Sequence, residues 1–266
     1  MKKLLASLLL LLAPVSTAFA SPFAYANTSV GEFGAIDLGT GAFTSIGVTP
    51  TVLAGIAMTP GGQIFGVDAS NNLVQINPTN AATTIVGNTG VSLATFAGMT
   101  TGQLYGLDFN NEVYSVNPTT GAATLVGPTG LPAIPGDGRF ANGLAGSDSS
   151  LYYSYQIYSS VNHGAFGPNL YSIDPTTGAP TFIGSTFTDA TTGLGEVGGT
   201  LYGPGEVGNS LYLYEFDAGT AAPTLIGPIT GTNGLIYGIA APVPEPTSIG
   251  LLGIGLLAGV RRLRRK

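Results

Sequence analysis

Short runs of β-branched and aromatic residues alternate with turn residues along most of the chain. A clear example is Asn111–Gly127, where Val113–Val116 is followed by the turn Asn117-Pro118-Thr119-Thr120-Gly121 and a second apolar run, Ala123–Val126. Proline sets φ for the first central position of a type I turn, asparagine accepts hydrogen bonds from the backbone ahead of it, and glycine tolerates a positive φ. The pattern predicts a β-hairpin that ends at Gly127.

The same hairpin pattern recurs through the chain. Further copies occupy residues 33–47, 72–87, 169–184 and 211–227, and their closing glycines are Gly47, Gly87, Gly127, Gly184 and Gly227, at spacings of 40, 40, 57 and 43 residues. A second pair of short apolar runs lies between successive hairpins, as in Leu53–Met58 with Gln63–Asp68. Four short strands in roughly 40 residues match the size of one β-propeller blade.

The two ends of this pattern complement each other. It begins with a hairpin at residues 33–47 and ends with a single apolar piece, Gly234–Ala240, that no hairpin follows. If these pieces share one blade, the ring closes and no sheet edge is left open. The repeats also resemble the broad propeller class with Leu-Tyr-Gly and Asp-Pro-Thr-Thr-Gly motifs. The predicted fold is therefore all-β, a five-bladed β-propeller with a split closing blade, and a two-sheet β-sandwich is the alternative.

Charge is scarce and unevenly placed. Only 8% of the 266 residues are charged, and there is no cysteine, so disulfides cannot support an exported fold. The body, residues 21–242, holds thirteen acidic residues and one basic residue, Arg139, for a net charge of about −12. Such a surface does not attract nucleic acid or an anionic membrane, although it could attract cations.

The N-terminal segment, residues 1–20, has the pattern of a secretory signal peptide. A basic start precedes an apolar run and the small-x-small sequence Ala18-Phe19-Ala20, which predicts a signal helix and cleavage before Ser21. The expected partners are the Sec translocon and signal peptidase. An uncleaved anchor helix is the alternative.

The C-terminal segment, residues 243–266, combines three features in order. Val243-Pro244-Glu245-Pro246 precedes a 12-residue apolar run, Ile249–Val260, and the segment ends in the basic residues Arg261, Arg262, Arg264, Arg265 and Lys266. A 12-residue helix is about 18 Å long, short of a bilayer core of about 30 Å, so it spans only marginally. The basic cluster is expected to stay cytoplasmic.

This segment resembles the PEP-CTERM sorting signal of Gram-negative bacteria. The resemblance implies recognition and cleavage near Pro244-Glu245-Pro246 by an exosortase-type membrane protease, with the C-terminal helix holding the chain in the membrane until then. It further implies a final location at the cell surface or outside the cell, in bacteria that make exopolysaccharide and biofilm. A plain C-terminal anchor is the alternative.

Few residues suggest catalysis. His163 is the only histidine, so a His-based metal site or a Ser-His-Asp triad would depend on it, and it lies in an apparent loop. Asp68 and Asp108 occupy one repeat position, either as turn acceptors or as part of a cation or sugar-hydroxyl site. We expect no catalytic residue, no metal site and no cofactor, with Ca²⁺ left open.

The third unit is 17 residues longer than its neighbours, and irregular insertions on a regular scaffold often carry binding sites. The extra length lies at about residues 129–140 and 156–168. The candidate ligand-binding residues there are Asp137, Arg139, Tyr155, Tyr158 and His163. Tyr152 and Tyr153 either add to the aromatic set or belong to the strand core.

Together these features predict an exported, non-enzymatic propeller with a structural or adhesive role, in contact with exopolysaccharide. The alternative is a polysaccharide hydrolase or lyase on a propeller scaffold. That alternative requires two carboxylates that converge in one funnel.

Overall fold

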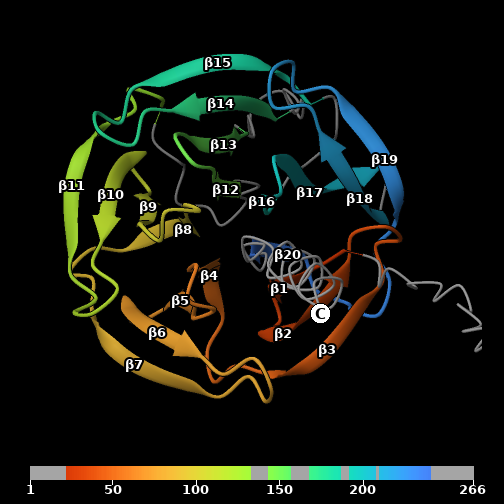
Figure 1. The fold of residues 1–266 in the computed structure, drawn as a ribbon, viewed down its shortest axis with the longest axis horizontal. Coiled ribbons are helices and arrows are strands. Elements are labelled where there is room, and N and C mark those ends of the chain that lie inside the picture. The colour runs from red at the N-terminus through yellow and green to blue at the C-terminus, as the bar shows by residue number, and fades with distance from the viewer. Residues whose placement is uncertain (1–21, 133–142, 157–167, 187–191, 208–209, 241–266) are drawn as a thin grey trace, which may run out of the picture.

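The computed structural model describes residues 22–132, 143–156, 168–186, 192–207 and 210–240. These residues form five antiparallel sheets of four strands each. Figure 1 shows the sheets arranged as blades around a central axis. The fold is a five-bladed β-propeller, which confirms the prediction, and it is not the β-sandwich.

Each blade runs outward from an innermost strand that lies beside the axis. The first blade holds β1 (Phe23–Thr28), β2 (Glu32–Asp37), β3 (Phe43–Val48) and the last strand, β20 (Ile236–Ala240). The second and third blades hold β4 (Leu53–Met58), β5 (Ile64–Asp68), β6 (Asn72–Ile76), β7 (Thr83–Asn88), β8 (Leu93–Gly98), β9 (Leu104–Asp108), β10 (Glu112–Val116) and β11 (Ala123–Pro128). The fourth and fifth hold β12 (Gly143–Gly146), β13 (Leu151–Tyr155), β14 (Asn169–Ile173), β15 (Pro180–Ser185), β16 (Gly195–Val197), β17 (Thr200–Val207), β18 (Ser210–Phe216) and β19 (Pro223–Pro228).

The first blade is shared by the two ends of the body, as predicted, but the division is three strands to one. β1 was not predicted; it lies between β20 and β2 and pairs with both, for example through Tyr25, which lies opposite Ala35 and Ala240. Two backbone hydrogen bonds outside the sheet also join the two ends of the body. The backbone N–H of Ser29 donates to the carbonyl of Leu235 at 2.8 Å, and that of Phe43 donates to Thr230 at 2.8 Å.

The repeated turn has the predicted chemistry. In the β10–β11 hairpin the Asn117 side-chain oxygen accepts hydrogen bonds from the backbone N–H groups of Thr119 at 2.8 Å and Thr120 at 3.1 Å. Gly121 has φ +77°, a conformation that glycine adopts without steric cost. The register then shifts between Val113 and Tyr114, which marks a β-bulge, and each of the other outer hairpins shifts at the equivalent place.

The closing glycine of each hairpin contacts the turn of the next blade. A Cβ placed on Gly87 would lie 2.0 Å from the carbonyl oxygen of Thr120, and one on Gly121 would lie 2.6 Å from the carbonyl oxygen of Gly87. The equivalent contacts of Gly127, Gly184 and Gly227 bring the same position to 2.3, 2.4 and 2.6 Å from a turn carbonyl. The repeated glycine and the repeated turn therefore form one joint between neighbouring blades.

The hydrophobic core is divided among the blade interfaces. Five buried clusters lie one at each interface between adjacent blades. Successive residues of a strand point to opposite faces of the sheet, so both faces of each blade are buried against a neighbour. In β13, for example, Tyr153 packs toward the third blade and Tyr152 toward the fifth. No disulfide holds the ring together, because the sequence contains no cysteine.

Two predicted elements cannot be compared with the structure. The signal helix, residues 1–20, and the C-terminal helix, residues 249–260, both lie outside the described residues. Within the described ranges, no helix has the length and apolar character needed to cross a membrane.

Candidate functional site

The strand order gives the disc two distinct faces. The hairpin face carries the outer turns, such as residues 117–122, and the loops that leave the innermost strands, such as 59–63. The connection face carries the turns between the second and third strands, such as 68–72, and the links from one blade to the next. Every innermost strand therefore runs from the connection face to the hairpin face.

The axis is closed by backbone packing between the innermost strands. A Cβ on Gly55 would lie 2.7 Å from the carbonyl oxygen of Phe96, one on Gly146 would lie 2.5 Å from that of Gly98, and one on Gly193 would lie 2.8 Å from that of Ile236. Small residues allow this close approach, as glycine in strands often does. Neighbouring innermost strands are therefore in direct backbone contact around the axis.

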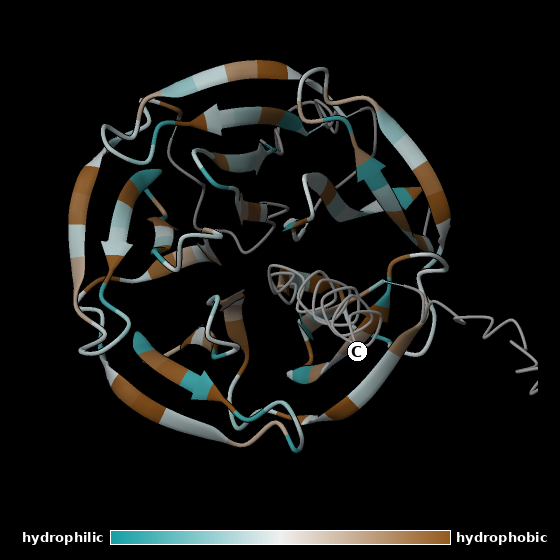
Figure 2. Ribbon diagram, viewed as in Figure 1, coloured by the Kyte–Doolittle hydropathy of each residue, from teal (hydrophilic) through white to brown (hydrophobic). Residues whose placement is uncertain are grey.

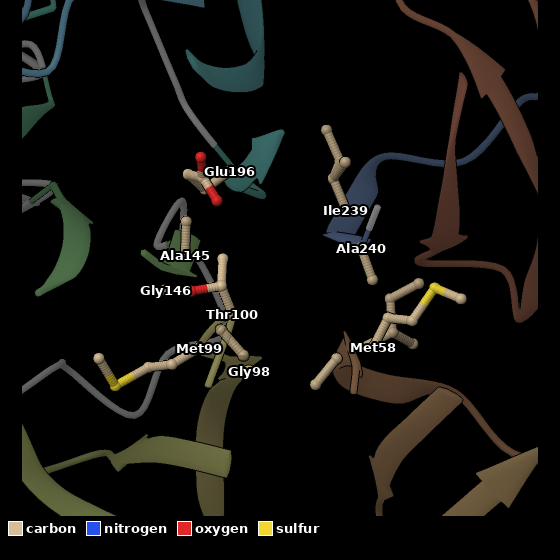
Figure 3. Close-up of a pocket in the computed structure, with 12 residues that line it drawn as sticks. Met58, Gly98, Met99, Thr100, Ala145, Gly146, Glu196, Ile239 and Ala240 are labelled. Carbon is tan, nitrogen blue, oxygen red and sulfur yellow. The ribbon is translucent and has the colours of Figure 1, made fainter. Parts of the chain in front are cut away.

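A hollow remains where these strands end at the hairpin face (Figure 3). All five innermost strands contribute to its wall. The lining residues are Ile56, Ala57, Met58, Ala97, Gly98, Met99, Thr100, Ala145, Gly146, Glu196, Ile239 and Ala240. The space in which the centre of a water molecule fits is about 30 Å³. That space admits a water or a small group, and it is far smaller than a typical ligand pocket.

Glu196 is the charged group in this wall. Burial raises the pKa of its carboxyl above the ordinary value; a hydrogen bond from the backbone N–H of Gly199 lowers it, and the nearby charge of Asp148 raises it. Asp148 is exposed and accepts a hydrogen bond from the hydroxyl of Thr100. Asp148 and Glu196 therefore lie near one edge of the hollow. Asp148 is hydrogen-bonded to Thr100, and the hollow has no room for a sugar ring.

The candidate ligand set is only partly described. Of Asp137, Arg139, Tyr155, Tyr158 and His163, the structure places Tyr155; the other four lie outside the described residues. Tyr155 is 5% exposed and packs beside Tyr153 and Tyr171 in the interface between the third and fourth blades. Burial, followed by the charge of Tyr171, raises its pKa to about 12. The ring of Tyr155 is part of the hydrophobic core and is too buried to stack on a sugar.

Tyr155 nevertheless fixes the start of the first insertion. Its hydroxyl donates to the carbonyl of Pro132 at 2.7 Å, and the side chain of Asn111 donates to the same carbonyl. Asn111 in turn accepts a hydrogen bond from the hydroxyl of Tyr153 at 2.7 Å. Pro132 is the last described residue before residues 133–142, so this buried network determines where the insertion leaves the connection face.

Asp68 and Asp108 behave as turn residues. The Asp68 carboxylate accepts backbone hydrogen bonds from Ser70 at 2.9 Å and Asn72 at 2.8 Å. Asp108 accepts them from Asn110 and Glu112, each at 2.9 Å. The turn interpretation is confirmed. Within the described ranges, no three His, Cys, Asp or Glu side chains gather as metal ligands would, and Ca²⁺ binding stays a prediction.

The hollow was not predicted from the sequence. One signal pointed toward it, since Glu196 is the only charged residue in any of the described innermost strands. A carboxylate in an otherwise apolar strand at the axis marks a place where the strand meets solvent.

The sorting residues Val243 to Pro246, the basic cluster from Arg261 to Lys266 and the cleavage residues Ala18, Ala20 and Ser21 lie outside the described residues. Residues 242–266 match the family model described as the PEP-CTERM protein-sorting motif. The chain carries a PEP-CTERM sorting signal. The signal indicates an exported surface protein that is processed by exosortase, a membrane protease. The match begins two residues after Ala240, the last described residue of the propeller.

The body is similar in fold to chains in solved structures. A chain in the crystal structure of a nidogen/laminin complex shares 16% identity at a TM-score of 0.53, with 85% of this chain and 82% of that chain covered. A structural-genomics protein of unknown function from Bacteroides thetaiotaomicron shares 16% identity at a TM-score of 0.57, with 84% and 65% covered. At this identity the likeness shows the fold alone. No curated protein matched the sequence, and no catalytic family is indicated.

Proposed function

We propose that this PEP-CTERM protein is a non-catalytic surface propeller with a structural or adhesive role, and that it binds exopolysaccharide outside the cell. The proposal is carried by a sorting signal for the cell surface that is attached to the propeller body. In that body, most of the described ionisable side chains accept hydrogen bonds in turns or pack in the core. The signal supports the location, and the body supports a role in contact and not in catalysis.

The rim of the disc supports a contact role. The outermost strands of four blades expose a large apolar side chain at the same position: Ile85 is 64% exposed, Leu125 53%, Phe182 58% and Leu225 57%. Figure 2 shows hydrophobic segments recurring around the outer strands. These strands carry no charged residue, so single apolar side chains recur around an uncharged rim. A neutral rim with threonine hydroxyls suits contact with a hydrated polymer.

The proposed ligand contacts lie on the connection face. Both insertions, residues 133–142 and 157–167, leave strand ends on that face, and the first starts at the anchored Pro132. Arg139 and Asp137 would bond sugar hydroxyls, while Tyr158 would stack on a sugar face. His163 would add a further hydrogen-bonding group.

The alternative of a hydrolase or lyase gains less support. Two carboxylates, Asp148 and Glu196, do approach one another at the hairpin face. The hollow beside them is about 30 Å³, and glycosidases need room for a sugar between the two carboxyl groups.

A binding assay with two readouts tests the proposal. The processed protein and its Arg139→Ala variant are applied to a glycan array and to exopolysaccharide purified from a producing strain. Thr119→Ala, an exposed change on the opposite face, is the matched control. Saturable binding that Arg139→Ala weakens at least tenfold and Thr119→Ala does not would support the proposal. Absence of binding, or release of sugar fragments from the polymer, would contradict it.

A further inference from the structure

From the direction of β20 and the shortness of the tail, we infer that the uncut protein turns its hairpin face toward the membrane and its connection face outward. This inference rests on the proposed surface location and on the expectation from the sequence that the C-terminal segment holds the uncut chain at the bilayer. It concerns which surface of the propeller an external polymer can reach.

The tail leaves the body at the centre of the hairpin face. β20 is an innermost strand, it runs from the connection face to the hairpin face, and its last residue, Ala240, lines the central hollow. Figure 1 shows β20 close to the axis. The body also begins on this face, since β1 runs antiparallel to β20 and Tyr25 lies opposite Ala240. Both chain ends of the propeller therefore depart from one side.

The tail is short compared with the disc. Residues 241–248 separate Ala240 from the apolar run that begins at Ile249, and eight extended residues reach at most about 29 Å. To place the connection face on the bilayer, the tail would first cross a blade of four strands, about 14 Å plus the outer side chains. It would then pass the thickness of a five-residue strand, about 17 Å, plus the turns at both ends. This path approaches 40 Å, which is longer than the maximum extension of the tail, about 29 Å.

No shorter path runs through the molecule. The innermost strands touch at Gly55, Gly146, Gly193 and Gly238, where an added Cβ would lie 2.5 to 2.8 Å from backbone of the neighbouring strand. A polypeptide cannot thread this centre. The short tail therefore excludes an orientation with the connection face on the bilayer.

Charge keeps the body from lying flat against lipid. The hairpin face carries the carboxylates Asp37, Asp148, Asp174, Glu196 and Asp217, and no residue in the described ranges is basic. Anionic headgroups repel such a surface. The tail therefore holds the hairpin face on the membrane side without close contact with the lipid. The connection face, where both insertions are rooted, is the surface presented to the extracellular polymer, while the hollow and the start of the tail face the protease.

The absence of cysteine allows a direct test with single labelled sites. Thr119→Cys on the hairpin face and Ser70→Cys on the connection face are both exposed turn positions. Each variant, as residues 21–266 with the tail intact, carries a donor dye. It is inserted into vesicles of phosphatidylethanolamine with one quarter phosphatidylglycerol and an acceptor-labelled lipid.

Energy transfer to the lipid should be stronger from Thr119→Cys by about twofold or more, because the two faces are about 20 Å apart along the strands. A flexible insertion of about 20 residues after Pro242, with a contour of about 66 Å, should abolish the difference. Equal or reversed transfer, transfer from neither site, or a difference that survives the insertion would overturn the inference. Polymer binding plays no part in this assay, so a failure of the adhesive role would leave its result unchanged.

Discussion

The joint between neighbouring blades makes a strong prediction at Gly87. In the Gly87→Ala variant the new methyl group would lie 2.0 Å from the carbonyl oxygen of Thr120, where ordinary contacts begin near 3.4 Å. The obstructing atom is backbone, and a Cβ on the reciprocal glycine, Gly121, would itself lie 2.6 Å from the carbonyl oxygen of Gly87, so neither side has space to yield. The second and third blades must separate locally by more than 1 Å.

Overpacking of this kind costs about 3 kcal/mol, the upper part of its usual range. In a body of this size, that free energy of unfolding corresponds to a fall in Tm of roughly 6–12 °C. The control is Gly61→Ala, where the nearest atom is the Thr59 hydroxyl oxygen at 3.9 Å. It should leave Tm unchanged or raise it slightly, because alanine reduces the entropy of the unfolded chain.

The five equivalent glycines extend the test to a ranked series. The nearest turn carbonyl oxygen would lie at 2.0 Å from the added methyl at Gly87, 2.3 Å at Gly127, 2.4 Å at Gly184, 2.6 Å at Gly227 and 3.0 Å at Gly47. Differential scanning calorimetry of the five alanine variants should follow this order, with Gly47→Ala the mildest. If Gly87→Ala melts within about 2 °C of Gly61→Ala, close backbone contact is not what requires glycine at this position.

Three further changes probe single interactions. Tyr153→Phe removes the hydroxyl that donates to Asn111 and should cost about 1–3 kcal/mol in urea unfolding. Burial raises the pKa of Tyr153 well above 10, so the native protein should lose stability as pH rises above about 10, and the variant should lose less. An equal slope for both proteins would contradict this. Asp174→Asn should be neutral at pH 7. Hydrogen bonds from Thr176 hold the pKa of Asp174 below its usual range, so the native protein should lose more stability than the variant as pH falls through that lowered pKa. Glu196→Gln should raise stability at pH 7 by less than about 1 kcal/mol, because burial raises the pKa of Glu196 and disfavours its charge. The gain should vanish in acid, where the carboxyl is protonated, and thermal melts at both pH values check it.

The parts of the fold that depend on local chemistry were predictable. The turn Asn117–Gly121 specifies its own conformation through one asparagine, one proline and one glycine, and closely related turns recur in the other hairpins along the chain. Repetition then indicated blades, and the unmatched ends indicated closure. None of these steps required knowledge of contacts between distant residues.

β1 was missed because its residues depart from the repeat. In the equivalent strand β5, Gly66 and Asp68 mark the pattern, whereas β1 has Ala26 and Thr28 at those positions. The structure shows that the substitution preserves the function of the site: the Thr28 hydroxyl accepts the backbone N–H of Glu32 at 3.0 Å, as Asp68 accepts that of Asn72. A threonine hydroxyl accepts the hydrogen bond that an aspartate carboxylate accepts in β5, so a search for the repeated aspartate does not find β1.

The candidate site was harder to predict for two reasons. The hollow depends on five strand ends that lie far apart in sequence, so no local pattern describes it. The burial of Tyr155 was not predicted, because a tyrosine next to an insertion could face solvent or the neighbouring blade. Its burial follows from the face of β13 that also carries Leu151 and Tyr153, and this becomes clear only once the third blade is in place.

The position of β20 also has a mechanical consequence. A pull on the C-terminal tail, from the membrane or from a polymer bound to the body, enters the propeller at Ala240 and acts along the strand. The hydrogen bonds of β20 to β1 lie across that direction, as in any antiparallel pair. The load is thus shared among all of them in shear and does not peel them apart one at a time. The final strand of the ring is therefore suited to hold a body under tension.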